Sequence, residues 1–391
     1  MQRFDYLIVG GGVAGVTAAE TIREFDPPGS IAVVSAEAHP LYSRVLLPHF
    51  VKGRIPRERL FLRTPEDYRA KGIALLAGQS AVNLDSDRRC LGLENGSEIE
   101  FGKLLVATGG STRRIGIPGE DLRGVSRFQT IQDADLMLAL LANAKQAAVA
   151  GGGFIALEYL EILAERRIPT TLIFRGPYFF ARHLDPVGGE LLRRNFERRG
   201  IAVIAEASLV LAEGREALEG VRTAKGRSVD CGFLCLGIGL ARNTAWLSSL
   251  ALTLTPGGVR TNEFLETEVK GIFAAGDVAE FYDRESGSFR GRGNWTNSFL
   301  QGRYAGGNMA RPQDQQPFRA VSSYSIKNLD FVISFVGETH RGGSGESIVR
   351  VLRERNIYER FFIADERIIG AVLINRPEDK SAVTALIQSG R

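Results

Sequence analysis

The stretch DYLIVGGGVAGVTAAE, residues 5–20, decides the fold of this chain. Its first part, residues 6–9, is a short apolar run that predicts a β-strand, and residues 16–23 predict a helix. A glycine-rich turn joins the two, and a second apolar strand follows at residues 31–34. A strand, a tight turn, a helix and a second strand form the first unit of an α/β fold with a parallel sheet.

The glycines of this first glycine turn, residues 10–15, each have a physical role. Gly10 allows the tight turn, Gly12 lets the backbone approach a pyrophosphate, and Gly15 lets the helix pack closely on the strand. The start of the helix then directs free N–H groups and the positive end of the helix dipole toward the phosphates. The pattern therefore predicts a dinucleotide-binding unit rather than an ordinary glycine-rich turn.

An acidic residue completes this pattern. Glu37 lies just beyond the second strand, 22 residues after Gly15, where a carboxylate can accept hydrogen bonds from a ribose.

The same pattern returns in the middle of the chain. Residues 146–150 predict a strand, and the second glycine turn, residues 151–156, leads into a helix at 157–166. Gly151 and Gly153 repeat the first two glycines, whereas Ala156 replaces the third, which the pattern tolerates. Two such units in one chain predict two nucleotide cofactors held face to face.

Composition places the chain among ordinary globular proteins. It has 391 residues, of which 44% are hydrophobic and 24% charged, which is enough for two or three domains. We expect a cytoplasmic protein, because no apolar run is long enough to span a membrane and no signal peptide is evident. The net charge of +4 is mild and spread along the chain, which argues against a nucleic-acid partner. A basic surface could suit an acidic protein partner or be merely solvated.

The three cysteines carry no recognisable redox or metal motif. Cys90, Cys231 and Cys235 form no CxxC pair, and no His/Cys cluster predicts a zinc or other metal site. Four residues of strand would separate the last two by about 13 Å, beyond the reach of a disulfide. We expect buried structural thiols.

Small residues follow two further predicted strands. Residues 103–106 run into Ala107, Thr108 and Gly109, and residues 271–275 run into Gly276 and Asp277. Such residues at the end of a strand allow close approach of a ligand.

Taken together, these motifs resemble the two-dinucleotide flavoprotein reductases of the FAD-dependent pyridine nucleotide oxidoreductase superfamily. Within this superfamily, the chain is most similar to the branch that contains the ferredoxin and rubredoxin reductases and the flavin domain of NAD(P)H nitrite reductase. The resemblance covers nearly the whole chain and includes GIFAAGDVAE around Asp277 and NWTNSFLQGR around Trp295. It implies an α/β fold with two Rossmann-like domains and a small C-terminal α+β domain.

The resemblance implies domain limits of 1–113 and 242–310 for the FAD domain, 114–241 for the NAD(P) domain, and 311–391 for the C-terminal domain. It assigns FAD to the first unit, where Glu37 would meet the ribose and Asp277 the ribityl chain. A cap for the next turn is the other reading of Asp277. The remaining FAD residues that it implies are Gly10, Gly12, Val13, Ala14, Gly15, Arg44, Val82 (through its backbone), Ala107, Thr108, Gly109, Gly276 and Trp295, the last of which could equally be ordinary core.

NADH or NADPH would bind the second unit, at Gly151, Gly153, Phe154, Ile155, Arg175, Arg182 and Gly237. Phe174 stands where NADH users often have an acid, and the two arginines after it favour NADPH, although solvated arginines would give the same pattern. Glu158 matches a family glutamate near the nicotinamide and flavin N5. A glutamate in the first helical turn is also favoured by the helix dipole alone.

The chain departs from the family at two places. Residues 39–53 contain no cysteine, where disulfide reductases carry their redox pair, so thiol-based catalysis is argued against. Pro48 and His49 occupy the place of a Ser-Lys pair beside the flavin. His49 is therefore either a partly charged catalytic group or a space-filling residue.

We thus expect an FAD-dependent NAD(P)H oxidoreductase that passes electrons to a carrier protein such as ferredoxin or rubredoxin, as a monomer or homodimer. The alternatives are an oxidase, a quinone or nitrite-pathway reductase, and a flavin-bearing subunit of a larger complex.

Overall fold

A computed structural model describes all residues except 249–251, 285, 341–345 and 391. The chain divides into two compact units, each assembled from three separate segments. Unit 1 comprises Met1–Val45, Pro56–Ser111 and Leu240–Ala320, and unit 2 comprises Leu46–Ile55, Thr112–Gly239 and Val321–Arg391.

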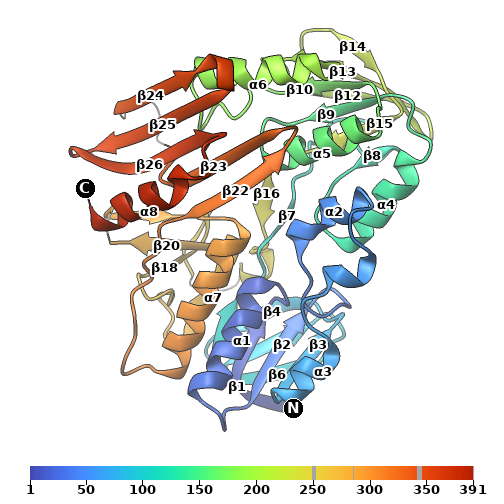
Figure 1. Ribbon diagram of the computed structural model, residues 1–391. Helices are drawn as coiled ribbons and strands as arrows, with labels where there is room; N and C mark the ends of the chain where they lie inside the picture. The colour runs from blue at the N-terminus through green and yellow to red at the C-terminus, as the bar shows by residue number, and fades with distance from the viewer. Residues whose placement is uncertain (249–251, 285, 341–345, 391) are drawn as a thin grey trace. The chain divides into compact units, whose positions relative to one another are not determined.

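Unit 1 is built on a seven-stranded sheet (Figure 1). Its strand order is β3-β2-β1-β6-β5-β4, and β19 pairs with β6. The strands β3, β2, β1, β6 and β19 pair in parallel, while β4 and β5 form antiparallel pairs at one side. Their bounds are β1 Gln2–Val9, β2 Ile31–Ser35, β3 Ile73–Ala77, β4 Ala81–Asp85, β5 Cys90–Leu93, β6 Glu98–Val106 and β19 Ile272–Ala274.

Alternate residues of β1 enter different cores because a strand presents successive side chains to opposite faces of its sheet. Tyr6 and Ile8 pack with the helices α1 (Val13–Phe25) and α7 (Trp295–Ala310). Leu7 and Val9 pack on the other face with apolar residues of β4, β5 and the 247–279 segment.

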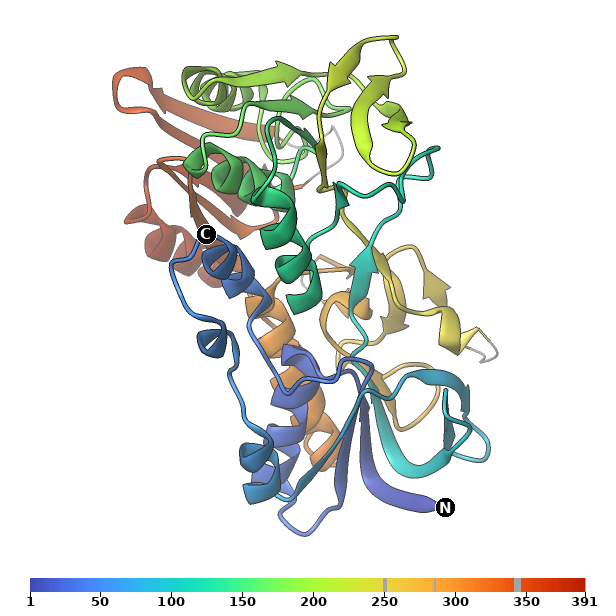
Figure 2. The ribbon, with the colours of Figure 1, turned by 90° about the vertical axis from the view of Figure 1, so that its right-hand side faces the viewer.

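The helices α1 and α7 lie side by side, as Figures 1 and 2 both show. Their backbones approach closely because α7 presents glycines to α1. A Cβ on Gly302 would lie 2.4 Å from the carbonyl oxygen of Ala14, and one on Gly306 would lie 2.6 Å from that of Ala18. Both distances are too short for any side chain, so these glycines set the packing of the two helices.

The rest of unit 1 consists of small elements. A four-stranded sheet has the order β17-β18-β20-β21, and β7 pairs with β16. The bounds are α3 Pro65–Ala70, β7 Gly110–Thr112, β16 Leu240–Arg242, β17 Leu254–Thr255, β18 Gly258–Thr261, β20 Ala279–Asp283 and β21 Ser288–Arg290.

Unit 2 contains a second parallel sheet, with the order β11-β10-β9-β15-β8. A small antiparallel sheet of order β12-β13-β14 is formed by the residues between β11 and β15. The bounds are α2 Leu47–Val51, β8 Val125–Ser126, α4 Ile131–Leu141, β9 Ala147–Ala150, α5 Phe154–Glu165, β10 Thr170–Ile173, α6 Pro186–Arg198, β11 Ile201–Ile204, β12 Leu209–Gly214, β13 Leu218–Thr223, β14 Ser228–Asp230 and β15 Phe233–Leu236.

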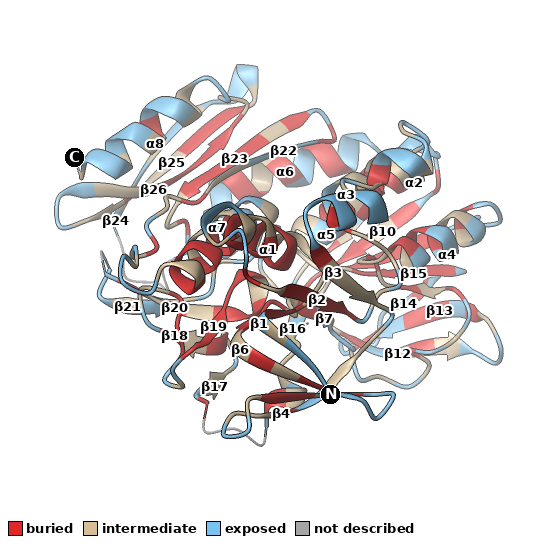
Figure 3. Ribbon diagram, turned by 90° about the horizontal axis from the view of Figure 1, so that it is seen from below, coloured by how far each residue is buried: buried red, intermediate tan, exposed pale blue. Residues whose placement is uncertain are grey.

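The end of the chain adds an antiparallel sheet to unit 2, with the order β22-β23-β26-β25-β24. Helix α8 packs on this sheet through Val383 and is otherwise largely exposed (Figure 3). The bounds are β22 Ser323–Asn328, β23 Phe331–Gly337, β24 Glu346–Leu352, β25 Ile357–Ala364, β26 Arg367–Ile374 and α8 Asp379–Ser389.

The architecture confirms the predicted α/β class with two Rossmann-like sheets. Helix α6 begins at Pro186 because Asp185 caps the N–H of Gly188 and proline is favoured in the first helical turn. Cys231 lies outside the strand that was expected to hold it, since β15 begins at Phe233. The three cysteines are buried and free, as predicted.

The contact between α1 and α7 supplies a test. Gly306→Ala should destabilise the protein by about 1–3 kcal/mol, because the added methyl meets the backbone of Ala18. The control is Gly307→Ala in the next position, whose Cβ would have no neighbour closer than 3.7 Å. That change should be neutral or stabilising by up to about 1 kcal/mol, since alanine favours helix. Urea unfolding of both variants measures the difference, and equal midpoints would contradict the packing described.

Candidate cofactor-binding sites

The first glycine turn is held by close contact with a neighbouring strand end. Gly10 has φ +128°, and a Cβ placed on it would lie 2.1 Å from the carbonyl oxygen of Ala107. A Cβ on Gly15 would lie 2.0 Å from the carbonyl oxygen of Gly10. Only glycine fits at either position, so the turn, the strand and the start of α1 are packed backbone to backbone.

Gly12 differs from these two glycines because nothing of the protein crowds it. A Cβ there would have no neighbour within 4 Å. Gly12 is the N-cap of α1 and provides no side-chain cap for the N–H groups at the start of the helix. An open space in front of uncapped N–H groups is the arrangement that binds phosphates.

Three strand ends meet at this point of the sheet. Val9, Val106 and Ala274 are in register on β1, β6 and β19. The turn at Gly10, the Ala107–Gly109 segment and the Gly276–Asp277 segment therefore leave the same edge together. This is the carboxyl edge of the parallel strands, where ligands of doubly wound folds bind.

Asn243 holds the Ala107–Gly109 segment in place through two hydrogen bonds with Thr108. Its Nδ2 donates to the Thr108 carbonyl oxygen at 3.0 Å, and its own carbonyl oxygen accepts from Thr108 Oγ1 at 2.8 Å.

Asp277 and Trp295 lie where η4 (Gly276–Val278) meets the start of α7. The Asp277 carboxylate accepts from Ser298 Oγ at 3.2 Å, so its described bond reaches α7 rather than capping its own turn. The Gly276 N–H donates to Gln301 Oε1 at 2.7 Å. Trp295 is half-buried against the core that α1 and α7 share.

Glu37 and Arg44 form a charged pair beyond the end of β2. The Arg44 guanidinium donates to Glu37 Oε1, and the Tyr42 hydroxyl donates to Glu37 Oε2 at 2.6 Å. The side chains of Glu37 and Arg44 are 27% and 37% exposed, so polar groups of a ligand could reach both.

Val82 lies at a register shift of β4, between the paired residues Ala81 and Asn83. Residues at such bulges have backbone groups outside the ladder. This suits the backbone contact expected of Val82.

The residues of unit 1 fit a bound dinucleotide such as FAD. The open space at Gly12 accepts a pyrophosphate, Glu37 can accept from a ribose, and Asp277 offers a carboxylate at a third strand end.

The second glycine turn repeats the geometry of the first. Gly151 has φ +141°, and its Cβ would lie 2.2 Å from the carbonyl oxygen of Gly237. Gly153 is the N-cap of α5 and has nothing within 4 Å of a Cβ. Ala156 is buried and lies against Gly237, whose Cβ would be 2.7 Å from the Ala156 nitrogen.

Phe154 and Ile155 begin α5 with opposite surroundings. The Phe154 ring packs in an aromatic cluster, 5.0 Å from the rings of Phe180 and Phe335 and 5.5 Å from that of Tyr324. Ile155 is 37% exposed. The Phe154 ring is thus engaged in the aromatic cluster, whereas the Ile155 side chain is open to a ligand.

Beyond β10, Phe174 is buried against Phe179, so its ring fills the core at the position where an acid would bind a ribose. Arg175 and Arg182 are exposed. No ion pair of either arginine occurs among the residues that the structure describes.

Glu158 lies in a cluster of charges on one side of α5. Burial raises the pKa of Glu158 to about 7, despite Lys52 Nζ at 3.9 Å from its Oε2. Lys52 itself donates to Glu161 Oε2, and its side chain is only 3% exposed. Glu161 also accepts from the Leu329 N–H at 3.3 Å and from Asn328 Nδ2 at 3.4 Å. A buried cation thus bridges two carboxylates of one helix.

His49 is on α2, one helical turn before Lys52. Burial, and after it the positive charges of Lys52 and Arg54, lower the pKa of His49. The structure also brings Lys52 close to Glu158. The sequence analysis did not single out Lys52. Its position three residues after His49, on the same face of a helical segment, was the one feature that could have pointed to it.

Other kinds of site find no support in the described part of the chain. Burial raises the pKa of the Cys231 thiol to about 12 and that of Cys235 well above its ordinary value. No group of three or more His, Cys, Asp or Glu there could hold a metal ion, and no described helix is long and apolar enough to cross a membrane.

Comparison with known proteins points to the same class of molecule. The chain is 25% identical over 389 residues to nitrite reductase [NAD(P)H] of Bacillus subtilis, covering 99% of this chain and 48% of that protein. It therefore spans about half the length of this relative. It is also 27% identical to the ferredoxin–NAD(+) reductase component of the p-cumate 2,3-dioxygenase system of Pseudomonas putida, covering 95% of this chain and 90% of that one.

Among solved structures, the covalent putidaredoxin reductase–putidaredoxin complex matches with a TM-score of 0.93 at 22% identity, covering 100% of this chain and 94% of that one. This likeness confirms the fold. The family model of the pyridine nucleotide-disulphide oxidoreductases, for which FAD and NAD(P)H are the typical cofactors, matches residues 4–302. With both glycine turns inside that range, the chain belongs to the pyridine nucleotide-disulphide oxidoreductase family.

Proposed function

We propose that this chain is an FAD-dependent NAD(P)H oxidoreductase that passes electrons from NAD(P)H through FAD to a carrier protein such as ferredoxin or rubredoxin. The observation that carries the proposal is the repeated glycine turn. Each unit has one, packed so tightly that a Cβ on its first glycine would lie 2.1 or 2.2 Å from a backbone oxygen, and open at the helix N-cap. A protein that binds one nucleotide needs one such turn, whereas transfer between two nucleotides needs two.

Unit 1 would hold FAD, with the N–H groups at the start of α1 on the pyrophosphate. Glu37 and Arg44 would bind the adenosine part, and Asp277 would accept from the ribityl chain. When bound, FAD supplies hydride acceptance from NAD(P)H and the later release of electrons. The protein contributes orientation and electrostatics.

Unit 2 would hold NAD(P)H at Gly151, Gly153 and the start of α5. We propose a preference for NADPH, because Arg175 and Arg182 are exposed just after β10 while Phe174 is buried. A guanidinium favours the extra phosphate of NADPH, and no acid stands at the end of β10 to bind the ribose of NADH.

Lys52 and Glu158 would set the charge near the reacting ring. With a pKa of about 7, Glu158 holds a proton in about half of the molecules at neutral pH. Lys52 is kept in place by Glu161 and supplies a fixed cation one helical turn beyond His49. We therefore add Lys52 to Glu158 and His49 as a proposed catalytic residue.

The acceptor would take electrons directly from the flavin, because no thiol relay is available near residues 39–53. The relative in the p-cumate dioxygenase system is a ferredoxin reductase component, which supports a carrier protein as acceptor. The match to half of a nitrite reductase favours a second candidate, a flavin-bearing part of a larger nitrite-reducing assembly.

The direct test is anaerobic stopped-flow mixing of the FAD-loaded protein with NADH and with NADPH. We expect bleaching of the flavin absorbance, followed by reoxidation when a rubredoxin or a [2Fe–2S] ferredoxin is added. Failure of both nucleotides to bleach the flavin would disprove the proposal. Rapid reoxidation by oxygen alone, with no response to a carrier, would favour an oxidase instead.

The nucleotide preference is tested by Arg175→Glu. The new carboxylate would repel the extra phosphate of NADPH and could accept from the ribose of NADH. We expect the ratio of kcat/KM for NADPH to that for NADH to fall about tenfold or more. Arg167→Glu, at another exposed arginine of unit 2, is the control and should leave the ratio unchanged.

The protonation of Glu158 is tested by stability. Between pH 4.5 and about 7 the folded protein keeps a proton that the unfolded chain has lost, so wild-type stability should fall as pH rises through this range. Glu158→Gln removes this dependence. We expect the variant to gain on the order of 1–3 kcal/mol relative to wild type from pH 4.5 to pH 8, measured by urea unfolding. Glu165→Gln, on the same helix, should show no such gain.

A further inference from the structure

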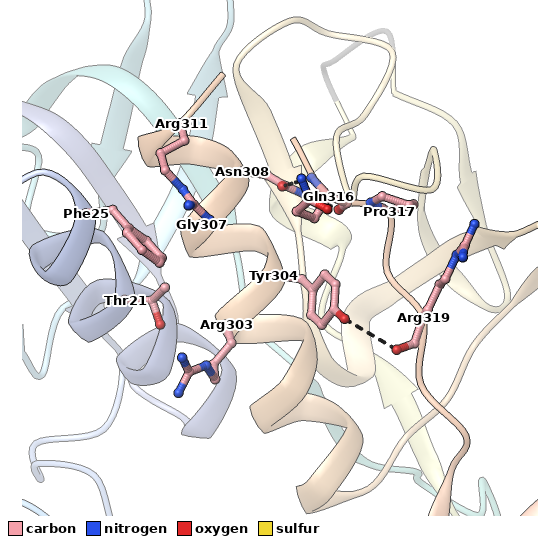
Figure 4. Close-up of a pocket in the computed structure, with 10 residues that line it drawn as sticks. All are labelled: Thr21, Phe25, Arg303, Tyr304, Gly307, Asn308, Arg311, Gln316, Pro317 and Arg319. Atoms are coloured by element: carbon pink, nitrogen blue, oxygen red, sulfur yellow. Dashed lines mark hydrogen bonds between the residues drawn. The ribbon is translucent and has the colours of Figure 1, made fainter. Parts of the chain in front are cut away.

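The cations of this chain occupy two kinds of surroundings. Arg303, Arg311 and Arg319 line a pocket of about 550 Å³ between α1 and α7, where the first and last of them are exposed (Figure 4). The only charged residues of the segment 288–320 are five arginines and one aspartate, which give a net charge of +4, so the expectation of evenly spread charge was wrong there. Lys52 has the opposite surroundings, because its side chain is only 3% exposed and meets carboxylates. A buried cation needs such partners, and their arrangement decides where its charge lies.

Three carboxylates lie on one side of α5. Glu158, Glu161 and Glu165 are three and four residues apart, a spacing that puts side chains on one helix face. Lys52 donates to Glu161 Oε2, and Arg54 donates to Glu165 Oε1. Glu158 is left with a longer contact, because Lys52 Nζ lies 3.9 Å from its Oε2, beyond hydrogen-bond distance.

Glu161 is fixed from its other side by the turn between β22 and β23. It accepts from the Leu329 N–H at 3.3 Å through Oε1 and from Asn328 Nδ2 at 3.4 Å through Oε2. Arg54 Nη1 lies 4.0 Å from the same Oε2. Donors on both oxygens hold the carboxylate in one orientation and stabilise its negative charge. Glu161 therefore offers Lys52 a fixed position.

The turn that holds Glu161 has a strained backbone. Asn328 pairs directly with Phe331, so Leu329 and Asp330 alone form the turn, with φ +48° and +66°. Two-residue turns of this kind favour asparagine and glycine, because most side chains are disfavoured in a left-handed backbone. Leu329 is nevertheless buried there, at 2% exposed. Such strain persists where the surrounding contacts fix the backbone, and it is concentrated at functional sites.

Strand β22 contacts α5 on both sides of Glu158 in the sequence. The Tyr324 ring lies 5.5 Å from the Phe154 ring at the start of the helix, and Asn328 donates to Glu161 further along it. Asn328 is 1% exposed, and its Oδ1 has no hydrogen-bond partner among the described residues. A buried amide with an unpaired oxygen costs stability, so packing alone does not explain why the turn carries it.

We propose that Glu161, fixed by the turn at residues 328–331, is a positioning residue that holds the Lys52 ammonium away from Glu158 and so lets Glu158 keep a proton at neutral pH. This inference rests on the proposed function, in which Glu158 lies near the reacting ring. An ammonium placed on Glu158 would favour its charged form, whereas one held on Glu161 does so only weakly. Burial, with a further contribution from the charge of Glu161, raises the pKa of Glu158 to about 7, which agrees with this arrangement.

The titratable groups around Glu158 come from the segment that begins with α2 and from α5 itself: His49, Lys52, Arg54, Glu161 and Glu165. From β22, the contacts described above are those of Tyr324 and Asn328, which carry no charge at neutral pH. Of the surrounding charges, that of Lys52 acts on Glu158 most strongly. A change that moves Lys52 should therefore have the largest effect on the proton of Glu158.

The test measures the proton of Glu158 directly. Infrared difference spectra of the whole chain with FAD added are recorded from about pH 5 to about pH 9, and they follow the C=O band of protonated carboxyl groups. The part of the band that is lost in Glu158→Gln belongs to Glu158. Glu161→Gln is measured alone and together with Lys52→Met, and Glu165→Gln is the control on the same helix face.

Glu161→Gln should fold, because a flip of the Asn328 amide lets its unpaired Oδ1 accept from the amide group that replaces Glu161 Oε2. Glu161→Asp is a second variant, which keeps the charge but has a side chain one methylene group shorter. It weakens the hold on Lys52 while the repulsion between two carboxylates remains. Circular dichroism and thermal unfolding establish which variants are folded.

We expect the titration midpoint of Glu158 to fall by about one pH unit or more in Glu161→Gln, because Lys52 loses its partner and pairs with Glu158. In the presence of Lys52→Met, the same change should shift the midpoint about half as far or less, since it removes only the repulsion between two carboxylates. Glu161→Asp should also lower the midpoint, by a smaller amount. Glu165→Gln should shift it by less than about 0.3 pH unit.

An unchanged midpoint in Glu161→Gln would overturn the proposal, and an unchanged midpoint in Glu161→Asp would do so if only that variant folds. Equal shifts with and without Lys52 would also overturn it, because Glu161 would then act by its own charge alone. None of these readouts needs NAD(P)H. If the midpoint shifts as expected while neither nucleotide bleaches the flavin, the proposed function fails and the positioning role of Glu161 stands. Bleaching with unchanged midpoints would give the reverse result.

Discussion

The structure depends on a backbone contact that only glycine permits. At Gly10 and again at Gly151, a positive φ places the turn against the carbonyl oxygen of a neighbouring strand end, Ala107 in one unit and Gly237 in the other. A Cβ at either glycine would lie within 2.2 Å of that oxygen. The turn is packed tightly on one side, while the N-cap glycine of the helix meets open space on the other. This asymmetry suits a phosphate.

The charges of unit 2 form a buried centre beside α5. The family is named for a disulfide, yet the three cysteines here are buried and free. The polar centre is instead a lysine, Lys52, held between Glu158 and Glu161. Burying an ion pair costs desolvation, and the raised pKa of Glu158 records that cost. Such a group is more easily explained by chemistry than by stability.

Much of the fold could be predicted from local patterns. The strand, turn and helix of each glycine turn follow from apolar runs and from glycines whose spacing has a steric reason, and the hairpin at Asn95–Gly96 follows from its turn residues. Contacts distant in sequence could not be predicted in this way. Gly302 and Gly306 of α7 lie against α1, which precedes them by nearly 300 residues. No local sequence pattern predicts that these two helices pack together.

The sequence by itself determined the fold class, the two nucleotide units and the absence of a cysteine pair, because each of these follows from residues that are close together in the sequence. Only the tertiary structure decided which side chains meet. It brought Lys52 rather than His49 to Glu158, and it gathered Arg303, Arg311 and Arg319 around one pocket. The reason is physical: burial and charge pairing depend on distances in space, and those are set when segments far apart in the chain pack together.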